Sequence, residues 1–321
     1  MNRFARINRI MTIAILPMMA IVIVMAARSV QSSREKVAMP RSGLLVVANL
    51  RGEDLTLIDL GAATSRTLEL PGPPHEMGVA GQRLYITLGR ANLLVEVDPR
   101  GPGILRTLAL EGEPHGLAID GDRLLVTLDK GDALVTVDRT SLTELAREPT
   151  GQTPHAVAIE GGVAYVAESR ANRLHAFPPG TTAETGSMPE SVAASDRYVA
   201  TADVESGTVS VFSLDGLQPA GRISVGGAPV RLQWLPGGLA AVSLNADARV
   251  AVVDPGKGKL LRKVTVGGHP DGLCVSPGND YLAVPSNETG AVAFLHLREW
   301  VVAGSLPAGD GPGSCAWLPA R

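Results

Sequence analysis

The segment PHGLAI at Pro114–Ile119 decides the fold, because its pattern recurs along the chain. It stands 40 residues earlier as PHEMGV (Pro74–Val79) and 40 residues later as PHAVAI (Pro154–Ile159). Weaker copies begin at Pro189 (PESVAA), Pro229 (PVRLQW), Pro270 (PDGLCV) and Pro312 (PGSCAW). A fixed period of about 40 residues is the sequence signature of a repeat architecture. Seven such units account for the chain beyond its N-terminal segment.

Each unit predicts four short strands. In the unit that begins at Pro114, the runs RLLVTL (Arg123–Leu128) and ALVTVD (Ala133–Asp138) alternate apolar and polar residues between turn residues. This alternation is typical of half-buried antiparallel strands. The aspartates that end the third strand are expected to close the next turn with their side chains, and they are Asp59, Asp98, Asp138 and Asp254. Four-stranded units at this period predict an all-β, seven-bladed β-propeller.

The phase of the repeat predicts how the ring closes. The chain enters on a second-strand pattern, LLVVA at Leu44–Ala48, and leaves on a first-strand pattern at Gly313–Leu318. We therefore expect the C-terminal strand to be the innermost strand of the blade formed by residues 44–70, which removes an open sheet edge. The propeller then spans residues 43–321. The other blades are expected to start near residues 73, 113, 153, 189, 229 and 270.

The N-terminal segment has the composition of an export signal. The first nine residues carry three arginines and no acidic residue, and an apolar run follows at Ile10–Ala27. Residues 1–27 are thus predicted to be either a cleaved signal peptide or an uncleaved anchor in the inner membrane, with residues 28–42 as a linker. Both alternatives place the rest of the chain outside the cytoplasm, in a periplasmic or extracellular location.

The whole chain excludes one class of partner. Its 321 residues carry a formal net charge of -3, which does not favour general nucleic-acid binding.

The composition of the chain suits many short strands joined by turns, with 36 glycines, 23 prolines and 3% aromatic residues.

The repeat resembles a known family. The units PHGLAIDGDRLLVTLDKGDALVTVDRTSLTELA and HPDGLCVSPGNDYLAVPSNETGAVAFLHL resemble the YVTN-type β-propeller repeat of exported bacterial proteins, over residues 43–319. This resemblance implies the fold and an exported protein. The family includes surface and periplasmic binding proteins, and related propellers serve as lactonases or dehydrogenase subunits, so the fold by itself does not imply an activity.

One repeat position carries candidate ligands. The residue after the repeat proline is, in chain order, His75, His115, His155, Glu190, Val230, Asp271 and Gly313. These residues are expected to form a ring at the mouth of the central channel. Three imidazoles and the Glu190 carboxylate suit a divalent metal such as zinc, or an anionic or carbonyl ligand. The alternative is that the histidines hydrogen-bond the loop between blades, as the corresponding histidine of WD-type repeats does.

A second ring divides by charge. The loops between second and third strands carry Arg51, Arg90, Lys130 and Arg170 on blades one to four, and Glu205, Asp247 and Glu288 on blades five to seven. The cationic half coincides with the histidines. This favours a small anionic ligand or an acidic protein partner over blades two to four. The alternative is that these are exposed turn tips, where charge is common.

A second resemblance concerns catalysis. The segment Thr153–Leu174 is similar to the repeat of streptogramin B lyases, seven-bladed propellers that open a cyclic depsipeptide lactone by metal-assisted elimination. The resemblance implies that His155 and Glu168 are a catalytic pair. The residues before the glutamate, Ala164–Ala167, depart from the aromatic run of that family. The implied activity is that of a metal-dependent lyase or lactonase acting on a lactone or ester.

The two cysteines allow two interpretations, a disulfide or a pair of free thiols. Cys274 and Cys315 fall on the innermost strands of the last and the first blade, which are neighbours across the closure. In an oxidising compartment they can form a disulfide that braces the shared blade. The alternative is a pair of small buried thiols.

The function expected from the sequence is binding. The chain has no Cys-x-x-Cys-His, no Gly-x-Ser-x-Gly, no phosphate loop, no His-Glu-x-x-His and no acidic calcium loop. No motif in the sequence requires a cofactor. The cofactor that the histidine ring suits is a divalent metal. We therefore expect a ligand-binding or protein-interaction module of the cell envelope, with the lyase or lactonase as the alternative.

Overall fold

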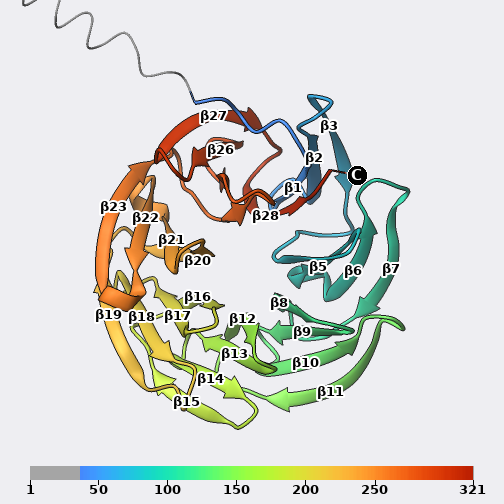
Figure 1. Ribbon diagram of the computed structural model, residues 1–321. Helices are drawn as coiled ribbons and strands as arrows, with labels where there is room; N and C mark the ends of the chain where they lie inside the picture. The colour runs from blue at the N-terminus through green and yellow to red at the C-terminus, as the bar shows by residue number, and fades with distance from the viewer. Residues whose placement is uncertain (1–36, 321) are drawn as a thin grey trace, which may run out of the picture. The chain divides into compact units, whose positions relative to one another are not determined.

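Seven antiparallel sheets form a ring in the computed structural model, which describes residues 37–320 (Figure 1). Each sheet has four strands, so the prediction of an all-β, seven-bladed propeller is confirmed. Among the described residues, helical structure is limited to three 3-10 turns, η1 (Gly89–Ala91), η2 (Asn245–Asp247) and η3 (Pro255–Lys257). No helix within residues 37–320 has the length and apolar character of a membrane span. The predicted leader at residues 1–27 lies outside the described residues.

The strands follow the predicted order from the innermost outward. Blade 1 consists of β28 (Pro312–Leu318), β1 (Leu44–Asn49), β2 (Asp54–Asp59) and β3 (Thr64–Glu69). Blade 2 consists of β4 (Met77–Ala80), β5 (Arg83–Leu88), β6 (Leu93–Asp98) and β7 (Gly103–Ala109). Blade 3 consists of β8 (Pro114–Asp120), β9 (Arg123–Leu128), β10 (Ala133–Asp138) and β11 (Thr143–Pro149). Blade 4 consists of β12 (Pro154–Glu160), β13 (Val163–Glu168), β14 (Arg173–Phe177) and β15 (Thr181–Glu184).

The remaining blades repeat this arrangement. Blade 5 consists of β16 (Pro189–Ala194), β17 (Tyr198–Asp203), β18 (Thr208–Ser213) and β19 (Pro219–Ser224). Blade 6 consists of β20 (Pro229–Leu235), β21 (Leu239–Leu244), β22 (Arg249–Asp254) and β23 (Lys259–Thr265). Blade 7 consists of β24 (Cys274–Val275), β25 (Tyr281–Ser286), β26 (Ala291–His296) and β27 (Val301–Pro307).

The ring closes as the repeat phase predicts. β28 pairs antiparallel with β1, from Leu44 opposite Leu318 to Asn49 opposite Pro312. Figure 1 shows this C-terminal strand beside the N-terminal blade. The first and last strands of the propeller therefore share one sheet, and neither leaves an unpaired inner edge.

The core consists of separate layers between neighbouring blades. In β1, Leu44, Val46 and Ala48 pack toward blade 2, whereas Leu45 and Val47 pack toward blade 7. All six residues of β1 are buried, and the other second strands are buried except at their first residue, so the expectation of half-buried strands is wrong for the second strands. The reason is that each sheet is covered on both faces by its neighbours. Exposure rises outward, and all seven residues of β11 are exposed.

Aspartates at the ends of third strands close the following turns, as predicted. Asp59 Oδ1 accepts hydrogen bonds from the backbone N–H groups of Gly61 and Ala62, both at 2.9 Å. Asp98, Asp138 and Asp254 accept equivalent bonds from the N–H groups of Arg100, Ser141 and Lys257. These carboxylates satisfy backbone donors at the turn and have a structural role.

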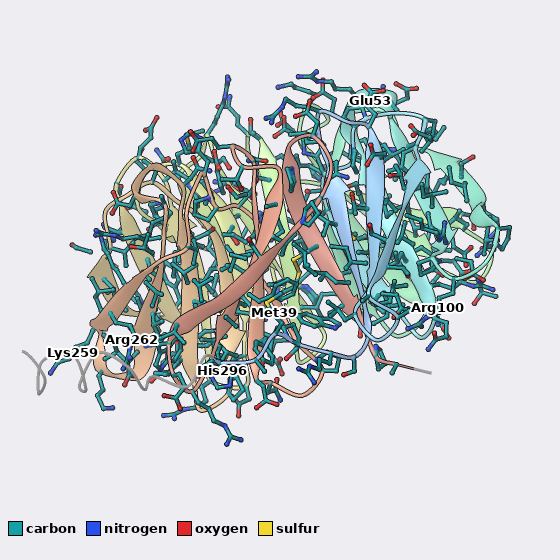
Figure 2. All side chains as sticks on the ribbon, turned by 90° about the horizontal axis from the view of Figure 1, so that it is seen from above. Met39, Glu53, Arg100, Lys259, Arg262 and His296 are labelled. Carbon is teal, nitrogen blue, oxygen red and sulfur yellow. A yellow bond between two sulfur atoms is a disulfide. The ribbon has the colours of Figure 1, made fainter. Side chains whose placement is uncertain are left out.

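A disulfide joins the closing strand to blade 7. Cys274 of β24 and Cys315 of β28 are bonded, with 6.0 Å between their Cα atoms and a sequence separation of 41. Met39, within the predicted linker, packs against the same junction cluster (Figure 2). Blade 7 and the shared blade 1 are therefore linked by a covalent bond as well as by apolar packing.

We expect the double variant Cys274→Ser, Cys315→Ser to be less stable by about 4 kcal/mol, because the disulfide restricts a loop of roughly 40 residues in the unfolded chain. Urea unfolding followed by tryptophan fluorescence measures the change. Reductant should lower the urea midpoint of the parent protein and leave that of the variant unchanged. Two free thiols in protein purified without reductant would contradict the prediction.

Candidate functional site

The predicted ring of channel residues lines one cavity. We call the face that carries the loops between second and third strands the upper face; Glu53 marks it in Figure 2, and Arg100 and His296 mark the opposite face. A cavity of about 170 Å³, the upper cavity, lies where the first strands begin. All seven residues that follow the repeat prolines line it: His75, His115, His155, Glu190, Val230, Asp271 and Gly313.

The three histidines stack along the cavity wall. The ring centroids of His75 and His115 are 4.4 Å apart, and those of His115 and His155 are 3.9 Å apart. His115 Nδ1 lies 3.0 Å from the carbonyl oxygen of His155, and His155 Nδ1 lies 2.8 Å from that of Glu190. For His115 and His155 this confirms the alternative in which the histidine binds the connection between blades.

These bonds fix the tautomer of the two rings. A carbonyl oxygen accepts hydrogen bonds and cannot donate, so Nδ1 of His115 and of His155 must carry the proton. In the neutral ring Nε2 then holds a lone pair. No hydrogen bond joins either Nε2 atom to another group within residues 37–320. The cavity wall thus presents imidazole acceptors.

Burial keeps the histidines neutral. Desolvation, with the nearby His155 and Arg231, lowers the pKa of His75 to about 4. Desolvation also lowers the pKa of His115 well below its usual value and lowers that of His155. Burial raises the pKa of the Glu190 carboxyl, an effect that the Arg231 charge opposes. The cavity therefore disfavours each charged form unless a partner compensates it.

The geometry does not supply the ligand set that the metal prediction requires. No three His, Cys, Asp or Glu side chains among residues 37–320 are grouped so that they could hold a metal ion. His75, His115 and His155 stack instead of converging, and two of them use Nδ1 on carbonyl oxygens. A metal centre needs ring nitrogens directed at one point.

No hydrogen bond joins His155 to Glu168, the implied catalytic pair, among the described residues. Glu168 is fully buried at the end of β13 and lines neither channel cavity. Its carboxylate accepts hydrogen bonds from the Gly151 N–H at 2.6 Å, from His175 Nδ1 at 2.9 Å and from Arg173 Nε. These three donors use the carboxylate to hold the connection between blades 3 and 4.

An arginine that sequence reasoning missed lies at the centre of the channel. Arg231 of β20 binds Glu76 across the channel, from blade 6 to blade 2, and its Nη2 lies 3.3 Å from Asp271 Oδ1. Its Nε–H is buried without a partner. Arg231 and Ser314 also line a second cavity of about 330 Å³, the lower cavity, which the first strands surround. The ion pair thus lies at the boundary of two cavities.

The sequence carried a signal for this pair. Two residues after the repeat proline, blade 2 has Glu76 and blade 6 has Arg231. The other five blades have small residues there, namely Gly116, Ala156, Ser191, Gly272 and Ser314. Opposite charges at one position of a closed ring indicate a contact across the axis.

Second-strand hydroxyls also connect the blades. Thr87 and Thr127 donate through Oγ1 to the carbonyl oxygens of His115 and His155, at 2.6 and 3.1 Å. Ser169 donates through Oγ to Pro189, at 2.7 Å. These bonds, together with those of the histidines, hold the first strands of blades 3, 4 and 5 against the preceding blades.

The four predicted cations lie at the rim of the upper face, and they differ in whether they form ion pairs. Arg51 Nε binds Asp310 at 2.8 Å, and Lys130 Nζ lies 3.2 Å from Asp129. Arg90 and Arg170 are exposed and form no ion pair with any described residue. The rim therefore presents two unpaired cations, beside blades 2 and 4.

Comparisons with known proteins show the fold alone. No protein-family model matches the chain, and no curated protein matches it. A functionally unknown protein from Desulfotomaculum acetoxidans has a TM-score of 0.74 at 11% identity, covering 87% of this chain and all of the other. A candidate 6-phosphogluconolactonase from Bacteroides fragilis has a TM-score of 0.72 at 16% identity, covering 86% and 98%. A streptogramin B lyase has a TM-score of 0.65 at 11% identity, covering 78% and 92%.

We expect Arg231→Met to lower the free energy of unfolding by about 3 to 5 kcal/mol, because it leaves Glu76 and Asp271 without their cation. Adding Glu76→Gln should restore part of the loss. Urea unfolding of both variants measures this, with Arg249→Met, an exposed arginine of the same blade, as control. Equal urea midpoints for Arg231→Met and Arg249→Met would contradict the role given to the cross-channel pair.

Stability should fall in mild acid. Unfolded His75 gains a proton near its usual pKa of 6.5, whereas folded His75 does so only near 4, so the unfolded state binds more protons between these values. His75 alone should lower the free energy of unfolding by about 2 kcal/mol between pH 7 and pH 5. Urea midpoints at the two pH values measure the loss, and His75→Asn should show a smaller one. A loss of the same size in His75→Asn would contradict this assignment.

Proposed function

We propose that this chain is a ligand-binding module of the cell envelope and that its ligand, or a group of its protein partner, enters the upper cavity. The observation that carries the proposal is the combination of a cavity with unsatisfied wall atoms. The Nε2 atoms of His115 and His155 and the Nε–H of Arg231 have no hydrogen-bond partner among the described residues. Such groups gain free energy when a ligand of matching chemistry binds.

A binding role is favoured over catalysis by how the side chains are used. Glu168, which the lyase resemblance needs as the partner of His155, is bound by three other groups. His115 and His155 are held in one tautomer by backbone carbonyls. Side chains held in one orientation around a small polar cavity suit selective binding.

An exported location is part of the proposal. Its support comes from the arginine-rich start of the chain and the apolar run at Ile10–Ala27. The Cys274–Cys315 bond adds support, because disulfides persist in oxidising compartments outside the cytoplasm.

A side chain added at Gly313 tests the proposal. A Cβ there would meet no atom closer than 3.7 Å, and Gly313 lines the upper cavity, so Gly313→Leu fills the cavity with little strain elsewhere. Gly221→Leu is the matched control, because Gly221 lies on β19 with open space around it. Thermal unfolding is measured with small amines, carboxylates, phosphate and sugars.

We expect at least one class of compound to raise the midpoint temperature of the parent protein and of Gly221→Leu but not of Gly313→Leu. Stabilisation of this kind follows from binding to the folded state alone. If every compound affects Gly313→Leu as it affects the parent protein, the upper cavity is not the binding site and the proposal fails.

A further inference from the structure

We propose that the upper cavity binds a primary ammonium group, carried by a small amine or by a lysine of a protein partner. This inference rests on the proposed function and names the ligand class of the same site. It differs from the anionic ligand that the rim charges suggest, because the residues inside the cavity have the opposite character to those on the rim.

The cavity wall has more acceptors than donors to offer. His115 and His155 each present an Nε2 lone pair, since their Nδ1 protons are used on carbonyl oxygens. The Glu190 side chain has no hydrogen bond or ion pair with any described residue, and its carboxylate lines the same cavity. Against these acceptors stand two unpartnered donors, the Nε–H of Arg231 and the one N–H of the neutral His75 ring, whose other nitrogen is a further acceptor.

The formal charges inside the cavity are negative in sum. Arg231 is the cation there, and it is compensated by Asp271 of the same cavity and by Glu76 of the lower cavity. Asp271 also accepts a hydrogen bond from Asn287 Nδ2, at 3.1 Å. Glu190 then remains as a second carboxylate of this cavity and has no ion pair with any described residue. An anion entering the cavity would face this carboxylate, whereas a cation would compensate it.

A primary ammonium group supplies both the hydrogen-bond donors and the positive charge that the cavity lacks. It has three N–H donors on one positive charge and no acceptor. It can donate to the imidazole Nε2 atoms and to Glu190 together, and it is small enough for a cavity of about 170 Å³. The stacked histidines do not converge as metal ligands must, which disfavours a divalent cation at the same place.

Binding should release a proton and weaken in acid. Burial raises the pKa of Glu190, with Asp271 and Asp129 acting in the same direction and Arg231 in the opposite one. An ammonium ion favours the ionised carboxylate, so its affinity should rise as the pH rises through this pKa. Protonation of His75, with its pKa near 4, opposes binding at lower pH.

Calorimetric titration of the full-length protein with ethylammonium tests the proposal. Acetate tests for an anion, tetramethylammonium for charge without N–H donors, and zinc chloride for a metal. We expect ethylammonium to bind at least tenfold more tightly than tetramethylammonium, and acetate not to bind in the cavity. The affinity should increase between pH 5 and pH 7.

Two variants separate the ligand contacts from the scaffold. Glu190→Gln removes the charge and keeps the shape, and His155→Asn keeps a donor for the Glu190 carbonyl while removing the Nε2 acceptor. Each should weaken ethylammonium binding by at least tenfold. Glu299→Gln, an exposed glutamate on the opposite face, should bind like the parent protein.

The outcomes distinguish the two proposals. If acetate or zinc binds in place of ethylammonium and Gly313→Leu abolishes that binding, the cavity is a site but the ammonium inference is overturned. If ethylammonium binds equally to the parent protein, Glu190→Gln and Gly313→Leu, both proposals fail. The peptide acetyl-Gly-Lys-Gly-amide identifies the source: binding tenfold tighter than that of ethylammonium indicates a partner's lysine, and equal or weaker binding indicates a small amine.

Discussion

Pairing of β28 with β1 is the contact on which the rest of the propeller depends. Each sheet buries both faces against its neighbours, so a missing blade would expose two apolar layers at once. Closure supplies the last junction, and the Cys274–Cys315 bond lies beside it. The ring of core layers between neighbouring sheets is thereby completed, and no sheet has to bury its apolar residues alone.

Closure also determines what the central channel can contain. The first strands approach each other so closely that a Cβ at Gly116 would lie 2.7 Å from the carbonyl oxygen of His155, and one at Gly272 would collide with that of Gly313. Small residues are therefore needed at this repeat position on most blades. The space that they leave lets Arg231 reach Glu76 from the far side of the ring. A tightly packed wall and a long cationic side chain together divide the channel into two cavities.

The histidines combine a structural and a chemical role. The Nδ1–H groups of His115 and His155 hold the start of the next blade, which is the function that the repeat needs. The same bonds fix the tautomer and turn Nε2 into an acceptor. A structural hydrogen bond thus decides what kind of ligand the cavity prefers, and the charges of Glu190 and Asp271 act in the same sense.

The sequence by itself determined the blade number, the strand order, the closure and the turn aspartates, because these follow from a period of about 40 residues and from local alternation. It also placed His75, His115, His155 and Glu190 on one ring, since equivalent repeat positions meet in a closed propeller. It did not determine which side chains pair. Glu168 bonds to Arg173 and His175, and Arg231 reaches Glu76 over 155 residues of chain, because partners across a ring depend on side-chain reach and burial. Only the tertiary structure, which brings these atoms within hydrogen-bond distance, decided the character of the cavity.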